Sequence, residues 1–224
     1  NMWAVPEAMQ YLQDRKISRE TAETYGLGFA FDFDGLSRAL IKKAYKEEHI
    51  IASGMAYRDE SKDRLKDMFW QRIMFPFYTK NGQIVGFTGR AINNQAAKYK
   101  NTGETILFTK GRQIWGLYQA KKHILKEDAV YIAEGQFDVM SMYQAGVNNV
   151  VGGSGTAFTD AQRKMLHGFT NNVIFIYDGD NAGVQAAYKN VPDFVRDGFR
   201  VRCVLLPQGK DPDEMIRSGK VDFQ

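Results

Sequence analysis

The stretch Val173–Gly183, "VIFIYDGDNAG", is an apolar run that ends abruptly in Asp-Gly-Asp. The run predicts a buried strand, and the polar residues after it predict a turn. Unpaired charge is costly to bury, so the acids at its end must be ion-paired, hydrogen-bonded or bound to a metal ion. Capping of the following helix by Asp178 or Asp180 is one alternative, because Asp is favoured at helix N-termini.

On both sides of this stretch, from residue 115 to residue 224, short apolar runs alternate with segments of helical spacing. The strand-like runs are "AVYIA", "NNVV", "NVIFIY" and "RVRCVLL". Short strands separated by helices of about ten or more residues are typical of a mostly parallel sheet covered on both faces. We therefore predict an α/β domain over residues 115–224.

Residues 1–114 have a different pattern, which predicts a smaller, basic α+β subdomain. Up to about residue 70, helical segments alternate with loops, and residues 36–50 form one amphipathic helix in this interpretation. Two β-rich runs follow and are joined through Asn81-Gly82, a strong hairpin signal. Residues 93–113 are polar and basic, and are predicted to form a loop.

Acidic residues follow three of the predicted parallel strands, at the carboxyl end of each. Ligands of an open parallel sheet bind at this edge. Clustered carboxylates repel one another unless cations lie among them, and hard oxygen ligands with room for water suit Mg²⁺. The sequence therefore predicts a magnesium site formed by acids from separate strands: Glu134, Asp178, Asp180, Asp211 and Asp213.

Three further features near these acids bear on other functions: one alternative is excluded and two stay open. An EF-hand loop starting at "DGDNAG" is excluded because its twelfth position is Lys189 instead of Glu. Asp138, one helical turn after Glu134, is either a supporting acid of the site or a surface residue. Residues 152–159, "GGSGTAFT", either cradle a phosphate or form a tight turn between a strand and a helix.

The composition excludes several classes of protein. A single cysteine, Cys203, allows neither a disulfide nor a zinc quartet within the chain, and its apolar neighbours predict a buried thiol. The three histidines lie far apart in sequence, which argues against a zinc site or a catalytic triad. No apolar run reaches the roughly 18 residues of a membrane span, and no signal peptide is visible. We expect a soluble cytoplasmic protein, and the first residues read as a start within a longer one.

The net charge of +4 is unevenly distributed. Residues 72–122 carry nine Lys and Arg against one Glu, a net charge of +8, whereas residues 1–71 carry −1 and residues 123–224 carry −3. A basic segment in a chain that also bears an acidic cluster is expected where a polyanion is held beside metal ions. A solvated basic surface is the alternative interpretation.

The motifs "EGQFDVMSMYQAGVNNVVGGSGTAFT", "YDGDNAG" and "DPDE" resemble, in order and spacing, the Toprim module of bacterial primases, topoisomerases and some nucleases. The segments "RIMFPFYTKNGQIVGFTGRAI" and "KYKNTGETILFTKGRQIWGLYQAKK" resemble the RNA polymerase domain of bacterial primase, the DnaG family. The resemblance implies that Glu134, Asp178 and Asp180 bind metal and that Asp211 and Asp213 form an additional acidic pair. It also places five basic residues near template and nucleotide: Arg72, Arg90, Lys98, Lys110 and Arg112.

What the resemblance implies is a catalytic core that makes short RNA primers on single-stranded DNA. The cofactor would be Mg²⁺, with Mn²⁺ able to substitute, and the substrates would be ribonucleoside triphosphates. The family's zinc-binding and helicase-binding domains are not recognisable here, so no zinc is expected within this chain. Contact with a replicative helicase would need that further C-terminal domain. The resemblance leads us to expect a monomer that does not bind membranes, either a core fragment or a reduced primase of a phage or mobile element.

Two other functions are compatible with the same motifs. A Toprim nuclease would use the same metal site to cleave nucleic acid, whereas a topoisomerase would need a nucleophilic tyrosine on a separate domain. A non-catalytic Toprim module would bind DNA without needing all three groups of acids.

Overall fold

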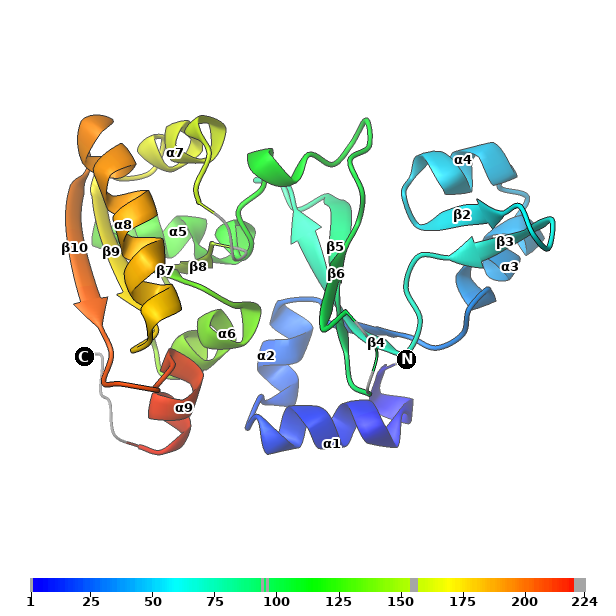
Figure 1. Ribbon diagram of the computed structural model, residues 1–224, viewed down its shortest axis with the longest axis horizontal. Helices are drawn as coiled ribbons and strands as arrows, with labels where there is room; N and C mark the ends of the chain where they lie inside the picture. The colour runs from blue at the N-terminus through cyan, green and yellow to red at the C-terminus, as the bar shows by residue number, and fades with distance from the viewer. Residues whose placement is uncertain (1, 94, 96, 154–156, 220–224) are drawn as a thin grey trace. The chain divides into compact units, whose positions relative to one another are not determined.

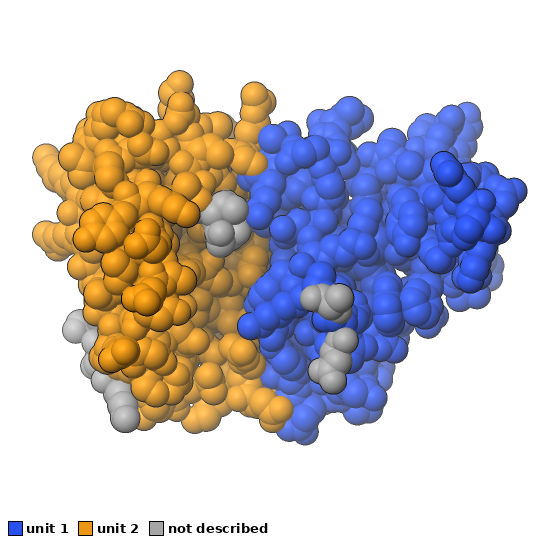
Figure 2. Space-filling model, in the orientation of Figure 1, with its two compact units in different colours: residues 1–12, 26–77, 84–110 blue, residues 13–25, 78–83, 111–224 orange. Residues whose placement is uncertain are grey.

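The computed structural model describes residues 2–93, 95, 97–153 and 157–219. The chain divides into two compact units, coloured separately in Figure 2. The first unit comprises residues 1–12, 26–77 and 84–110, and the second comprises residues 13–25, 78–83 and 111–224. The main division lies between residues 110 and 111. The sequence predicted a domain boundary close by, between residues 114 and 115, and that boundary stays a prediction.

The second unit contains a four-stranded parallel sheet with the strand order β10-β9-β7-β8 (Figure 1). Its strands are β7 (Val130–Ala133), β8 (Val150–Gly152), β9 (Asn172–Tyr177) and β10 (Arg200–Leu205). The helices of this unit include α2 (Arg19–Thr24), α5 (Leu117–Glu127), α6 (Gln136–Gln144), α7 (Asp160–His167), α8 (Asn181–Arg196) and α9 (Pro212–Arg217). The predicted α/β fold with a mostly parallel sheet is confirmed.

Both faces of this sheet are covered by helices. On one face, Ile132 and Phe175 pack in a core with Leu166 of α7 and Phe194 of α8. The connections β7-α6-β8 and β9-α8-β10 run in opposite directions along the sheet. Because such crossovers are right-handed, α6 covers the face opposite to α8.

This reversal of direction makes the junction of β7 and β9 a topological switch point. The two strands are parallel neighbours, with Tyr131 paired to Ile174 and Ile132 to Phe175. The connection after β7 leaves toward β8, and the connection after β9 leaves toward β10. A crevice for a ligand forms where neighbouring connections diverge in this way. The residues that follow β7 and β9 are therefore those expected to form a site.

The first unit contains a sheet with the strand order β1-β4-β5-β6. These strands are β1 (Gly28–Ala30), β4 (Arg72–Tyr78), β5 (Ile84–Ala91) and β6 (Tyr99–Asn101). Between β4 and β5, the Thr79 amide donates to the Gln83 carbonyl at 2.8 Å, and Gly82 has a φ of 89°. The hairpin expected at Asn81-Gly82 is thus confirmed. The short strand β6 lies within a segment predicted to be a loop, so that expectation was wrong for three residues.

Two other expectations for the amino-terminal residues were wrong. The helix expected over residues 36–50 is two helices, α3 (Gly35–Lys42) and α4 (Glu47–Ala52), because Ala44 between them has a φ of 63°. Residues after α4 form an antiparallel hairpin of β2 (Ala56–Asp59) and β3 (Arg64–Asp67) instead of a loop. Of the apolar side chains in this hairpin, only Ala56 and Leu65 join the small core with Ile50. So little apolar alternation gives a weak strand signal in the sequence. Helix α1 (Pro6–Asp14) is one of the helical segments expected before about residue 70.

Cys203 is exposed, which corrects the expectation of a buried thiol. It lies on β10, which ends the order β10-β9-β7-β8 and pairs only with β9 in the described part of the sheet. An apolar run on an edge strand looks the same in sequence as one on a central strand. Among the described residues, no helix has both the length and the apolar character needed to cross a membrane.

Candidate functional site

Glu134 and Asp178 lie side by side at the switch point of the parallel sheet. Glu134 directly follows β7 and Asp178 directly follows β9. The Asp178 amide donates a hydrogen bond to Oε1 of Glu134 at 3.3 Å. Oδ1 of Asp178 is buried and has no hydrogen-bond partner among the described residues. An unpartnered carboxylate oxygen of this kind calls for a ligand that supplies positive charge.

The environment of these acids disfavours their ionised forms. Burial raises the pKa of Asp178 to about 7, and the neighbouring Glu134, Asp211 and Asp180 contribute to the increase. The pKa of Glu134 is also raised, mainly by burial, although the hydrogen bond from the Asp178 amide opposes this effect. A bound divalent cation would remove this repulsion, and carboxylates with raised pKa values in a crevice are typical of functional sites.

Asp138 belongs to the same acidic group, which the sequence left open. Its side chain is buried, and its carboxylate accepts a hydrogen bond from the Gly135 amide at 2.9 Å. Burial, together with Asp178 and Asp211, raises the pKa of Asp138 to about 8. Asp138 is therefore not a surface residue, and the structure favours the alternative of an acid that supports the site.

Gly179 joins the turns that follow β9 and β10. Its amide donates to the Lys210 carbonyl at 2.9 Å, and its carbonyl accepts from the Gly209 amide at 2.9 Å. A Cβ atom at position 179 would lie 1.9 Å from the carbonyl oxygen of Pro207. Only glycine allows this approach of two backbones. The contact fixes Asp178 and Asp180 relative to the turn that precedes Asp211.

Asp180 and Asp211 both cap helices, so the alternative considered for Asp180 is partly realised. Asp180 is the N-cap of α8 and accepts from the Gly183 amide at 2.8 Å. Asp211 is the N-cap of α9 and accepts from the Glu214 amide at 2.6 Å. Each of these bonds uses one carboxylate oxygen. The second oxygen of each acid remains available as an acceptor for a cation.

Asp213 has a different environment from the other predicted acids. Its side chain is fully buried and is ion-paired to Arg15 at 2.8 Å and to Arg217 at 3.2 Å. The Ser141 hydroxyl also donates to it at 2.6 Å. These partners tie α9 to α6 and to the residues after α1. They favour a structural task for Asp213, and its catalytic role stays a prediction. No sequence signal identified Arg15 as its partner.

The acids do not form a closed metal cage. Within the described part of the chain, no group of three or more Asp, Glu, His or Cys side chains is arranged to hold a metal ion. Mg²⁺ is usually held by one or two carboxylates together with waters and substrate phosphates. Glu134 and Asp178 supply two carboxylates, and Asp178 supplies an oxygen without a partner among the described residues. The residues present therefore fit a magnesium ion that takes some of its ligands from the protein and the others from water and a substrate.

The stability of the metal-free protein is expected to fall as the pH rises from about 4 to about 8. The folded-state pKa values of Asp178 and Asp138, about 7 and about 8, exceed the usual 3.9 or so. The folded state thus binds more protons than the unfolded state in this range, which gives a negative slope. Urea unfolding in EDTA at several pH values measures the slope, and Asp178→Asn should flatten it. If the stability of the wild type did not change with pH in this range, the raised pKa values of Asp178 and Asp138 would be contradicted.

Of the predicted basic residues, Arg72 is buried and has structural partners. Its guanidinium donates to the Gly89 carbonyl at 2.9 Å, the Ala97 carbonyl at 2.9 Å and the Gln95 side chain at 2.7 Å. Burial lowers its pKa. These bonds hold the connection between β5 and β6 against β4. Contact of Arg72 with DNA or nucleotide stays a prediction, and the structure favours a supporting task.

Arg72→Met is expected to destabilise the protein by about 2–3 kcal/mol, because it leaves the buried Gly89 carbonyl and the part-buried Ala97 carbonyl without this donor. Chemical unfolding measures the loss, and Arg112→Met, at an exposed position, is the control. Unchanged stability with reduced DNA affinity would instead assign Arg72 to ligand binding.

The other basic residues are more accessible. Arg90 lies over the rings of Tyr99 and Tyr11, at 4.9 Å and 5.7 Å from their centroids. Lys98 and Arg112 are exposed, whereas Lys110 is half-buried and its backbone amide donates to Glu104 at 3.0 Å. Arg90, Lys98 and Lys110 belong to the first unit, and Arg112 to the second. Of the segment 152–159 considered as a phosphate cradle, residues 154–156 lie outside the described residues.

Two family models match the chain and together cover most of it. The model of the DNA primase catalytic core, N-terminal domain, matches residues 3–121, and a Toprim-like model matches residues 131–216. The DNA primase of Escherichia coli K12 is 36% identical over 222 residues, which cover 97% of this chain and 38% of that protein. The chain spans about a third of the length of the curated relatives it matches.

Solved structures are similar over almost the whole chain. The Aquifex aeolicus primase (zinc-binding and RNA polymerase domains) has a TM-score of 0.92 at 32% identity, covering 98% of this chain and 54% of that one. The catalytic domain of DnaG primase bound to single-stranded DNA has a TM-score of 0.82 at 36% identity, covering 95% of this chain and 70% of that one. The similarity extends over both compact units.

Proposed function

This chain belongs to the DNA primase catalytic-core family, and from this premise we propose that it synthesises short RNA primers on single-stranded DNA. The reaction is metal-dependent nucleotidyl transfer from ribonucleoside triphosphates. The observation that carries the proposal is the pair of Glu134 and Asp178 at the switch point, with a buried carboxylate oxygen that no donor among the described residues reaches. A non-catalytic DNA-binding module has no need of such a repulsive arrangement.

Glu134 and Asp178 would hold Mg²⁺, and Asp180 offers the carboxylate oxygen that does not cap α8. When bound, the ion supplies charge neutralisation at the triphosphate and activation of the attacking 3′-hydroxyl. The chain's own residues orient these carboxylates through the Asp178 amide and the backbone bonds of Gly179. Asp138, whose raised pKa favours its neutral form, limits the negative charge of the site while no cation is bound.

Arg90, Lys98, Lys110 and Arg112 are proposed to bind the phosphates of template and nucleotide. Phosphate contacts from Lys and Arg supply affinity without reading sequence. A relative of known structure has single-stranded DNA bound to its catalytic domain. We propose weak, salt-sensitive binding of DNA by this chain, with a dissociation constant of about 10⁻⁴ to 10⁻⁶ M. Delivery to a replication fork in the cytoplasm by a replicative helicase also stays a prediction.

Lys98→Ala and Lys110→Ala are each expected to weaken binding of single-stranded DNA or nucleotide. The plot of log K against log salt concentration should become shallower by about one unit for each phosphate that the variant no longer neutralises. Fluorescence anisotropy at several salt concentrations measures this slope, and Lys62→Ala, at an exposed position of the same unit, is the control. An unchanged slope would assign these lysines to a solvated surface.

The proposed function is tested by incubating the protein with single-stranded DNA, labelled ribonucleotides and Mg²⁺ or Mn²⁺. A ladder of short RNA products supports primase activity. Shortened DNA would identify a nuclease, and binding without either product would identify a non-catalytic module.

A further inference from the structure

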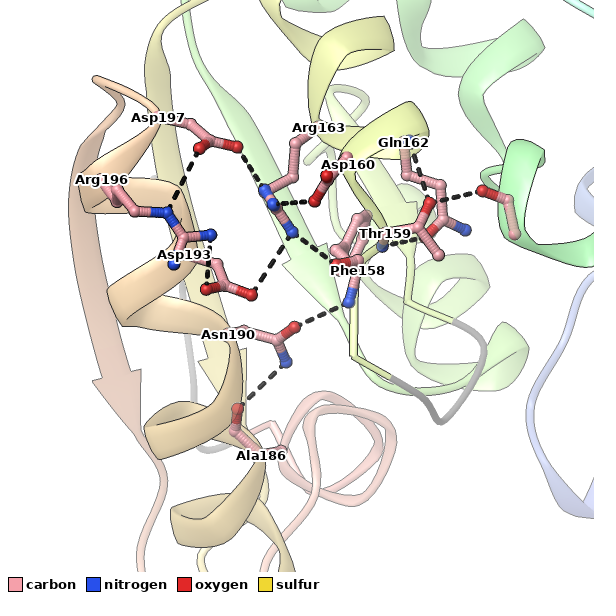
Figure 3. A network of polar contacts seen from close by, with 11 residues as sticks. Phe158, Thr159, Asp160, Gln162, Arg163, Ala186, Asn190, Asp193, Arg196 and Asp197 are labelled. Carbon is pink, nitrogen blue, oxygen red and sulfur yellow. Dashed lines mark hydrogen bonds and ion pairs between the residues drawn. The ribbon is translucent and has the colours of Figure 1, made fainter.

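A buried arginine connects α7 to α8 in the second unit. Arg163 of α7 is 2% exposed, and Figure 3 shows its guanidinium between the two helices. Its Nε donates to Asp197 at 2.5 Å, one terminal nitrogen is ion-paired with Asp160, and the other lies 3.5 Å from Asp193. The same nitrogen that approaches Asp193 donates to the carbonyl of Phe158 at 2.7 Å. Arg163 therefore holds a backbone group in addition to the three carboxylates.

The second polar backbone group of Phe158 is held by α8. Its amide donates to Oδ1 of Asn190 at 2.9 Å, and the Asn190 side chain donates in turn to the Ala186 carbonyl at 3.0 Å (Figure 3). Asn190 is itself buried. Both hydrogen-bonding groups of one residue are thus fixed by side chains of helices that flank it, which leaves its backbone little freedom to move.

From Phe158 a chain of contacts leads to the candidate metal-binding acids. The Phe158 ring lies close to Gly153, where an added Cβ would be 3.1 Å from the ring edge. The Gly153 amide donates to the carbonyl of Ala133 at 2.9 Å, and Ala133 directly precedes Glu134. Glu134, Gly153 and Phe158 all line one cavity of about 290 Å³. Phe158 is therefore linked through Gly153 to the backbone that carries Glu134.

We infer that Arg163 and Asn190 are positioning residues for Glu134, acting through Phe158 and the backbone of Gly153. The inference rests on the proposed function, because Glu134 is assigned there to metal binding. Neither residue needs to touch metal, nucleotide or DNA. Partners of this kind orient a ligand residue, and their loss commonly weakens metal affinity about 10- to 100-fold.

The test compares Asn190→Ala with a matched control. Asn190→Ala removes the acceptor of the Phe158 amide. Arg196→Ala is the control, because exposed Arg196 forms ion pairs with Asp193 and Asp197 and, among the described residues, no hydrogen bond with Phe158. Arg163→Lys is the second variant: it keeps the positive charge and loses the geometry that reaches the Phe158 carbonyl. Thermal melting establishes that each variant is folded before it is compared.

Three quantities are measured: the amide exchange rates of Gly153 and Phe158, the dissociation constant for Mn²⁺, and kcat and KM for primer synthesis. For Asn190→Ala we expect both amides to exchange about 10-fold faster, Mn²⁺ to bind about 10-fold more weakly and kcat to fall with DNA affinity unchanged. Faster exchange with Mn²⁺ affinity equal to that of Arg196→Ala would overturn the inference, as would unchanged exchange or a wild type that binds no Mn²⁺. A wild type that binds Mn²⁺ but makes no RNA would overturn the proposed function, and the exchange and Mn²⁺ data would still decide the positioning role.

Discussion

Asp178→Asn is expected to lower primer synthesis by about 10³-fold or more, because it removes a charge that neutralises the cation at the reacting phosphates. The fold should not suffer. Burial raises the pKa of Asp178 to about 7, so its ionised form is disfavoured in the metal-free protein. At pH 8 without metal, the variant should therefore melt at a temperature equal to or a few degrees above that of the wild type. Primer assays and thermal melting in EDTA measure the two effects.

Glu134→Gln is expected to have the same two effects, a loss of primer synthesis and an equal or higher melting temperature. Asp180→Asn should also lose synthesis, with a smaller gain in melting temperature. Asp180 caps α8, and Asn keeps an oxygen that can cap the helix but loses the negative charge that favours a helix N-terminus. Glu127→Gln, at an exposed position at the end of α5, is the matched control and should change neither quantity. Near-normal synthesis by any of the three site variants would remove that residue from the metal site.

Gly179→Ala is expected to have the second largest effect, on folding and activity together. The new Cβ would lie 1.9 Å from the Pro207 carbonyl oxygen, so the turns after β9 and β10 would have to separate. Separation would break the two backbone hydrogen bonds that Gly179 makes to that turn. We expect a decrease of about 3 kcal/mol in the free energy of unfolding, within the range for steric overpacking of a backbone contact. Chemical unfolding measures it.

Primer synthesis by the folded fraction of Gly179→Ala should also fall, because Asp178 and Asp180 flank the displaced residue. Gly103→Ala is the control for stability, because a Cβ there meets no atom within 4 Å and the φ of that glycine lies outside the left-handed region. Wild-type stability in Gly179→Ala would show that the two turns are not locked together in solution.

The sequence by itself determined the sheet of the second unit and the edge on which its acids lie. Apolar runs separated by helical spacing leave few arrangements open, because crossover connections are right-handed and parallel strands bury both faces. Acids placed directly after two such strands must then come to the same edge. This is why Glu134 and Asp178 could be placed at one edge of the sheet before the structure was known, and why the hairpin at Asn81-Gly82 was predicted correctly. These features depend on short-range patterns.

Only the tertiary structure decided which charged residues are partners of one another. Asp213 meets Arg15 across 198 positions of sequence, and Arg72 is buried against carbonyl groups that carry no sequence signal. The exposure of Cys203 likewise depends on the place of β10 at the end of the sheet. The physical reason is common to all three cases. Burial and ion pairing are set by which elements pack together, and a carboxylate or guanidinium reads the same in sequence whether it faces a ligand or a structural partner.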